Sequence, residues 1–86
     1  MMILRLTNSF EREFVRITRG NIPLKKKVAK TLNLIIQNPK HPSLRLHKLE
    51  GDNYWSISVD KSIRVLIIFE NEIIYAYHIG KHEEVY

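Results

Sequence analysis

The hydrophobic period of this sequence changes near residue 40, and this change determines the class of fold that the chain can adopt. Before that point, apolar residues recur every three or four positions, which is the spacing of one buried face of an α-helix. After it, apolar and polar residues alternate, as they do in β-strands with one buried face. The 86 residues are enough for a single small domain, residues 1–86. We therefore expect a two-layer α+β domain with helices first and strands after them.

The first predicted helix follows a short apolar segment, Ile3–Leu6, which is a candidate opening strand. Asn8 and Glu11 have the spacing of a capping box, and they predict a helix over Ser9–Arg19 that Gly20 would stop. One side of this helix is apolar, with residues at the spacing i, i+4 and i+7. Its charged residues are expected to face water; they are Glu11, Arg12, Glu13 and Arg16.

The second predicted helix begins at Pro23, a residue suited to a first helical turn, and ends near Gln37. Its apolar stripe consists of Leu24, Val28, Leu32 and Ile35. Only three or four residues separate the two helices, so we expect them to form an antiparallel hairpin.

The second half of the chain predicts an antiparallel meander of three or four strands. The predicted segments are Leu44–Leu49, Trp55–Val59, Ile63–Phe69 and Ile73–Ile79. Turns of about three residues join the last three segments, so these strands must be neighbours in the sheet. Gly80 is expected to close the final strand. The helical hairpin and the N-terminal strand would pack on this meander.

Composition excludes several classes of protein and of site. The chain has no Cys, so it can form neither disulfides nor thiolate metal sites. Its four histidines lack the spacing of paired metal ligands, and no metal or other cofactor is expected. The longest apolar run, Val65–Phe69, is far shorter than the roughly 20 residues that span a bilayer. Arg5 interrupts any apolar leader, and we expect a cytoplasmic protein with no membrane partner.

Charge is divided unevenly along the chain. Residues 1–49 contain eleven Lys or Arg and two acids, a balance of +9, whereas residues 50–86 contain three against seven, a balance of −4. A basic face of this kind favours a polyanionic partner. The alternative is that the basic helices are simply solvated.

Two residues near the end of the chain are candidates for chemistry. Arg64 is the second residue of an apolar strand, and because a buried charge is costly unless paired, it should reach a solvent-facing surface and meet an anion there. The alternative is an edge charge that limits strand association. Histidine ordinarily titrates near pH 6.5, so His82 could move protons at neutral pH, although a lone histidine is more often structural.

The combination of these residues with their neighbours matches the needs of RNA cleavage. Attack of a 2′-hydroxyl on its own phosphate requires a base, an acid and a cation, and it requires no metal. Histidine, lysine, tyrosine and arginine suffice, and an aromatic ring can stack on an unpaired base. We therefore expect a cationic pocket in which Arg64 faces His82 and Tyr86.

Four segments resemble the RelE/ParE toxin superfamily, and in particular its RelE and YafQ-type mRNA interferases. The tail, Ile79–Tyr86, is similar to the ending of that family. His41–Gly51 and Tyr54–Val59 resemble two upstream motifs, and Ile63–Val65 resembles the strand that carries the family's arginine. The segments keep the family's order and cover almost the whole chain.

The resemblance implies a toxin of a type II toxin–antitoxin pair. Such toxins cut mRNA in the ribosomal A site without metal, until a cognate antitoxin blocks them in a hetero-oligomer. By this resemblance His82 serves as the acid/base, Tyr86 orients or stacks on the RNA, and Arg64 stabilises the phosphate. The RNA-binding residues would be Lys81, His47, Lys61, Lys25, Lys26, Lys27 and Lys30, and the last four, on the second predicted helix, would suit ribosomal RNA. His47 could instead be packed beside Leu46 and Leu49.

Two other functions remain open at this point. ParE-type relatives share the fold but act as non-enzymatic inhibitors of DNA gyrase, and they generally lack the His82 and Tyr86 pair. A third alternative is an inactive module that binds RNA or an antitoxin. It is favoured by Ser58, which stands where many relatives carry arginine.

Overall fold

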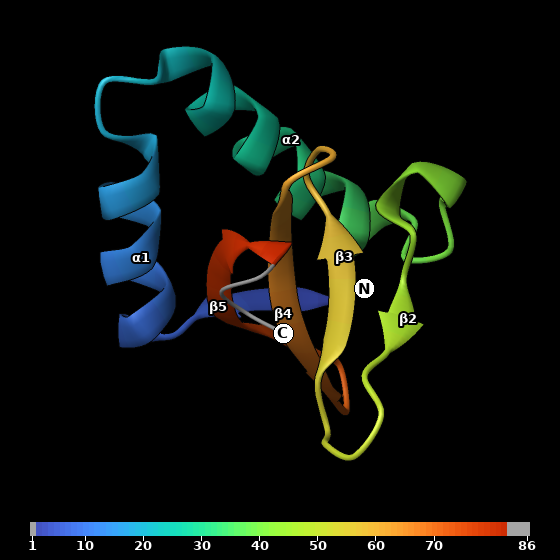
Figure 1. The fold of residues 1–86 in the computed structure, drawn as a ribbon. Coiled ribbons are helices and arrows are strands. Elements are labelled where there is room, and N and C mark those ends of the chain that lie inside the picture. Colours follow the sequence, from blue (N-terminus) through green and yellow to red (C-terminus); the bar gives the residue numbers. More distant parts are fainter. Residues whose placement is uncertain (1, 83–86) are drawn as a thin grey trace.

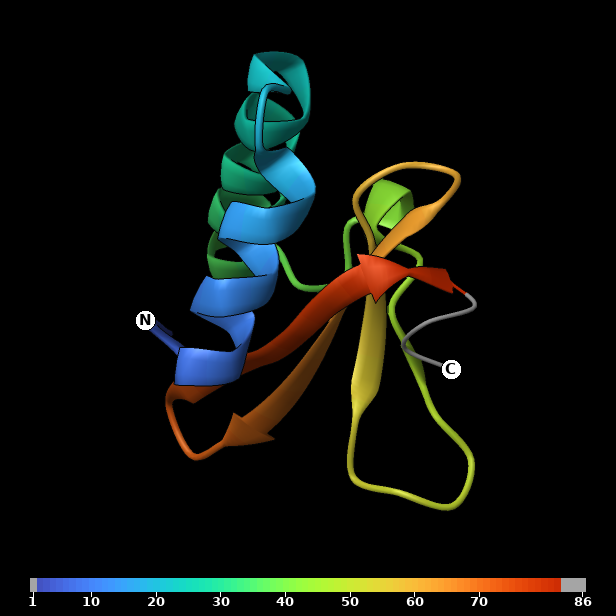
Figure 2. The ribbon, with the colours of Figure 1, turned by 60° about the vertical axis from the view of Figure 1, so that its left-hand side comes forward.

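The computed structural model describes residues 2–82, in which two helices cover one face of a five-stranded sheet (Figures 1 and 2). The elements are β1 (Ile3–Leu6), α1 (Asn8–Thr18), α2 (Ile22–Gln37), the 3₁₀ turn η1 (Pro42–Leu44), β2 (His47–Lys48), β3 (Trp55–Ser58), β4 (Ile63–Glu70) and β5 (Ile73–Lys81). The predicted two-layer α+β architecture is confirmed. None of the helices within residues 2–82 has the length and apolar character needed to cross a bilayer.

The sheet has the strand order β1-β5-β4-β3-β2, and it is mixed rather than purely antiparallel. Strands β2 to β5 form the expected antiparallel meander. In contrast, β1 joins the edge of the sheet parallel to β5, with Ile3 opposite Ile73 and Leu6 opposite Ala76. The two strands lie at opposite ends of the sequence, so no tight turn dictates their relative direction.

The helices form the predicted antiparallel hairpin, and in Figure 2 α1 lies in front of α2. The N-cap of α1 is Thr7 rather than Asn8, and because Phe10 then occupies the third helical position, the expected capping box of Asn8 and Glu11 is wrong. The Thr7 hydroxyl accepts a hydrogen bond from the Phe10 N–H at 3.0 Å and donates to the Tyr77 carbonyl at 2.9 Å. It thereby caps the helix and ties its start to β5. Gly20, with φ +67°, follows α1 as expected of a helix stop.

The core lies between the helices and the sheet, and it contains the predicted apolar stripes. The fully buried side chains from the helices are Phe10, Val28 and Ile35, and those from the strands include Ile57, Val65, Ile67, Ile74 and Ile79. In β4 the residues at alternate positions, beginning with Ile63, face this core. The other positions, beginning with Arg64, therefore face the opposite side of the sheet.

Two features of the sheet differ from the predictions. The expected strand over Leu44–Leu49 is reduced to the two residues of β2, because η1 and the left-handed backbone of Arg45 (φ 49°) interrupt the extended conformation. Gly80 does not end the last strand, since β5 continues to Lys81, which lies opposite Ile63.

A register shift interrupts the β4–β5 pairing. Leu66 lies opposite His78 and Ile67 opposite Ala76, so Tyr77 is an extra residue on β5. This is the geometry of a β-bulge, which bends and twists the strand that carries it. The part of β5 beyond the bulge leads to the candidate site.

Candidate functional site

Arg64 stands on the open face of the sheet, between two small residues of the neighbouring strands. It lies opposite Ser58 of β3 and Gly80 of β5. Residues paired directly across a sheet share a face, so the arginine has a hydroxymethyl group on one side and no side chain on the other.

The guanidinium of Arg64 has unused hydrogen-bonding capacity. Its Nε and Nη1 atoms are buried and have no hydrogen-bond partner within residues 2–82. The Ser58 hydroxyl donates to the Asp60 carbonyl at 2.8 Å and makes no hydrogen bond to these two nitrogens. A buried charged donor without an acceptor costs about 1–3 kcal/mol or more. An anion that reaches these nitrogens would recover this free energy.

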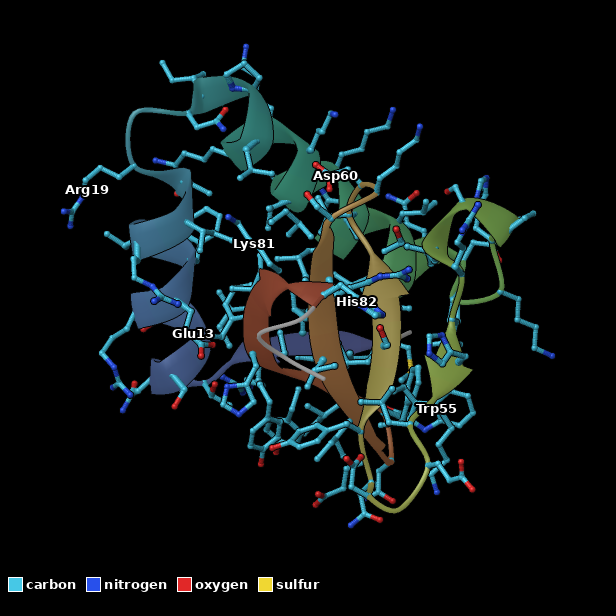
Figure 3. The ribbon with its side chains drawn as sticks, viewed as in Figure 1. Glu13, Arg19, Trp55, Asp60, Lys81 and His82 are labelled. Atoms are coloured by element: carbon cyan, nitrogen blue, oxygen red, sulfur yellow. The ribbon has the colours of Figure 1, made fainter. Side chains whose placement is uncertain are left out.

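A cationic hollow of about 350 Å³ opens beside Arg64, and we refer to it as the arginine hollow. Its other lining residues are Lys61, Ser62, Lys81 and His82, from the β3–β4 turn and the end of β5. The His82 N–H donates to the Ser62 carbonyl at 2.8 Å, so the residue that follows β5 is held against the turn. Figure 3 shows His82 in front of the sheet, on the side of β4 and β3. Among residues 2–82, the lining includes the cations Lys61, Arg64 and Lys81 and contains no acidic side chain.

Asp60 fixes the turn that forms one wall of this hollow. Its carboxylate accepts hydrogen bonds from the N–H groups of Ser62 (2.9 Å) and Ile63 (2.8 Å), and from the Ser62 hydroxyl (3.3 Å). Burial alone would raise the pKa of Asp60, but these hydrogen bonds and the charge of Lys27 outweigh it and lower the pKa. The carboxylate is therefore ionised at neutral pH and holds Lys61 and Ser62 in place.

Glu13 of α1 holds the end of β5 from the other side. One of its oxygens accepts a hydrogen bond from the Ile79 N–H at 3.1 Å and lies 3.2 Å from His78 Nδ1. The pairing of β1 with β5 ends at Leu6 and Ala76. Ile79 therefore lies on a part of the β5 edge that β1 does not pair with, and Glu13 accepts its N–H there. The expectation that Glu13 faces water is wrong, because this side chain is half-buried between α1 and β5 (Figure 3).

Four residues expected to contribute to the site lie together in the arginine hollow: Arg64, His82, Lys61 and Lys81. Tyr86 lies outside the described residues. His47 is exposed on β2, where its Nδ1 is 3.2 Å from the Arg45 carbonyl, and it does not line this hollow. Its exposure also excludes the packed position that was the alternative.

The lysines of α2 occupy a different part of the surface. Lys25, Lys26, Lys27 and Lys30 are all exposed on that helix. Lys27 additionally lines a second hollow, next to the first. Within residues 2–82, no three His, Asp or Glu side chains are grouped so that they could hold a metal ion.

Sequence reasoning missed the residues that position the hollow rather than line it. For Asp60 a signal existed, since Asp60 and Ser62 at this spacing are typical of an Asx turn. For Glu13 and His78 there was no local signal, because they lie 65 positions apart and meet only when α1 packs on β5.

Comparison with known proteins is informative at the level of structure. No family model matches the sequence, and no curated protein matches it. A copper-bound mutant toxin from Helicobacter pylori superposes over the full length of both chains, with a TM-score of 0.85 and 16% identity. YafQ from Escherichia coli superposes with a TM-score of 0.82 and 13% identity, and the match covers 100% of this chain and 99% of the YafQ chain. A chain from the DinJ–YafQ toxin–antitoxin complex of E. coli also matches, with a TM-score of 0.80 and 13% identity. The match covers 99% of this chain and 97% of the other.

The architecture is therefore that of toxins from toxin–antitoxin pairs. The two helices on a five-stranded mixed sheet are the fold that YafQ also has. The resemblance found in the sequence is confirmed for the fold.

Proposed function

We propose that this protein is the toxin of a type II toxin–antitoxin pair and that it cleaves mRNA. The observation that carries the proposal is the pair of buried, unpartnered guanidinium nitrogens of Arg64, in a cationic hollow that His82 also lines. This arrangement suits a phosphodiester, which is an anion and which gathers further charge on its oxygens during cleavage. The shared fold with YafQ supports the same assignment.

The proposed reaction needs only groups from the chain and the RNA. The 2′-oxygen forms a bond to the adjacent phosphorus and the bond from phosphorus to the 5′-oxygen breaks, which yields a 2′,3′-cyclic phosphate and a 5′-hydroxyl. A base takes the 2′-hydroxyl proton, and an acid gives a proton to the 5′-oxygen. His82 acts in this proton transfer and Arg64 stabilises the phosphoryl oxygens, with Lys61 and Lys81 adding positive charge. Tyr86 is proposed from the family resemblance to orient the RNA.

The proposed partners follow from the same family. A cognate antitoxin would bind the toxin and block it, as DinJ is found in complex with YafQ. The ribosome would present the mRNA, and the exposed lysines of α2 would contact ribosomal RNA through its phosphates. The site of action would then be the cytoplasm.

The proposal is tested in a translating extract to which the protein is added. We expect cuts in mRNA at defined codon positions, mapped by primer extension, and growth arrest when the protein is expressed in cells. Arg64→Ala and His82→Ala should each abolish the cuts while the circular dichroism spectrum is kept. Arg19→Ala is the matched control, because Arg19 is exposed on the far side of α1 (Figure 3). Intact mRNA together with inhibited DNA supercoiling would instead identify a gyrase inhibitor.

A further inference from the structure

A second hollow, of about 710 Å³, adjoins the arginine hollow, and we refer to it as the helix groove. It lies between α1, the start of α2 and the β3–β4 turn. Ser62 and Lys81 line both hollows, so the two adjoin at these residues, with Ile63 lining the helix groove and Arg64 the arginine hollow. Figure 3 shows Lys81 in the space between α1 and the turn that carries Asp60. The volume is within the range of about 300–1,000 Å³ that is typical of small-ligand sites.

The helix groove has a net positive charge. Within the part of the chain that the structure describes, its cations are Arg16 from α1, Lys27 from α2 and Lys81 from β5, and its acid is Asp60. The Asp60 carboxylate is engaged by the N–H groups of its own turn, at 2.8 and 2.9 Å. The four charged groups sum to +2, so the groove attracts anions.

Apolar side chains form the rest of the lining. Ile17, Leu24 and Ile63 contribute to it, and Ile63 is almost fully buried. A nucleotide combines a flat, largely apolar base with an anionic phosphate. The groove offers surface for both, with the base on the aliphatic side chains and the phosphate near the cations.

We propose that the helix groove binds the nucleotide next to the cleaved bond in a single-stranded RNA. The inference rests on the proposed function, because it takes the arginine hollow as the place of the scissile phosphate. Lys81 lines both hollows and would lie between two successive phosphates of the bound strand. Neither the fold comparison nor the sequence motifs assign this role to Arg16 or Lys27.

An acidic protein segment is the competing ligand, since it would satisfy the same charges. The position of the groove next to the arginine hollow favours RNA. A strand with its scissile phosphate beside Arg64 must leave that hollow, and the groove is one way out that carries positive charge. A protein segment has no comparable reason to occupy both hollows.

The inference is tested by binding of 2′-O-methyl RNA, which lacks the attacking hydroxyl and is not cleaved. A fluorescent hexanucleotide and a dinucleotide are titrated by anisotropy against the wild type, Arg16→Gln, Arg19→Gln and Arg64→Gln. Arg16 and Arg19 are exposed residues of the same helical region, and only Arg16 lines the groove. We expect Arg16→Gln to weaken hexanucleotide binding about fivefold and to lower the slope of log K against log salt by about 0.7. A dinucleotide has only the phosphate assigned to Arg64 and lacks the second phosphate that would lie near Arg16, so its binding should be unchanged in Arg16→Gln and reduced in Arg64→Gln.

The possible failures are distinguishable. If Arg16→Gln and Arg19→Gln bind the hexanucleotide equally, the groove assignment is wrong, while loss of binding in Arg64→Gln would leave the proposed function intact. If neither Arg16 nor Arg64 affects RNA binding, both are overturned. A hexaglutamate peptide that binds more tightly than the hexanucleotide, and loses affinity in Arg16→Gln, would identify the groove as a protein-binding site instead.

Discussion

The backbone N–H of Ile79 on β5 donates a hydrogen bond to the carboxylate of Glu13 on α1, at 3.1 Å. The same carboxylate contacts His78 Nδ1, so one acidic side chain holds two successive residues of the strand. Lys81 and His82 follow after Gly80 and line the arginine hollow. The position of these two residues therefore depends on the packing of the first helix as well as on the sheet.

Removal of the Glu13 carboxylate should loosen the end of β5. In Glu13→Ala the Ile79 N–H loses its acceptor, and we expect the free energy of unfolding to fall by about 1–2 kcal/mol. Hydrogen exchange of the Ile79 amide should accelerate beyond the global change. Glu11→Ala, at an exposed position of the same helix, is the control. An Ile79 amide as protected as in the wild type would show that the contact does not hold the strand.

Substitution of Arg64 should separate stability from function. Methionine has a similar length and no hydrogen-bonding donors, so Arg64→Met removes the two buried, unpartnered nitrogens. We expect the free energy of unfolding to stay the same or rise by about 1 kcal/mol, while RNA cleavage is lost. Urea unfolding and the primer-extension assay measure the two effects. A loss of several kcal/mol would mean that the guanidinium supports the fold.

Acid should weaken the β3–β4 turn through Asp60. The pKa of this carboxyl is lowered in the folded protein from its ordinary value of about 3.8. Its ionised form therefore stabilises the fold above that value, and the contribution is lost as the pH falls through the folded-state pKa. We expect Asp60→Asn to flatten the acid side of the stability profile between about pH 5 and 2. Glu72→Gln, in the exposed β4–β5 turn, should leave the profile as in the wild type.

Backbone conformation should decide the effects of substitution at Gly20 and Arg45. A Cβ at Gly20 would meet no atom within 4 Å, but the φ of +67° makes Gly20→Ala unfavourable by about 1 kcal/mol. Arg45 already adopts a left-handed φ of 49°, and Arg45→Gly should stabilise the protein by about 0.5 kcal/mol. Urea midpoints measure both changes. Shifts in the same direction for the two variants would contradict this account.

Local patterns predicted most of the fold. The bounds of α2 and the order of β3, β4 and β5 follow from hydrophobic period and turn residues, which depend on near neighbours in the chain. The parallel pairing of β1 could not be predicted in this way, because it joins the two ends of the sequence. The same reason applies to Thr7, whose hydroxyl bonds both its own helix and Tyr77.

The part of the candidate site that depends on the antiparallel pairing of β4 with β5 could be predicted from the sequence. Arg64 begins one strand and His82 follows the next, so antiparallel pairing brings the two positions to the same end of the sheet. The helix groove was not predictable, since Arg16, Lys27 and Lys81 converge only when both helices pack beside the β3–β4 turn. The uneven distribution of Lys and Arg along the sequence indicated a basic face, but it did not indicate where the arginine hollow and the helix groove lie on that face.

The extra residue Tyr77 determines which atoms stand next to the arginine. Had the pairing kept the register it has near the β4–β5 turn, Arg64 would lie opposite Ile79 instead of Gly80. A branched aliphatic side chain would then cover the guanidinium, and the core would lose the same side chain. The arginine hollow therefore depends on the one-residue shift at Tyr77, because the same sequence paired without this bulge would exchange the inner and outer faces of the strand end and place Ile79 over the guanidinium.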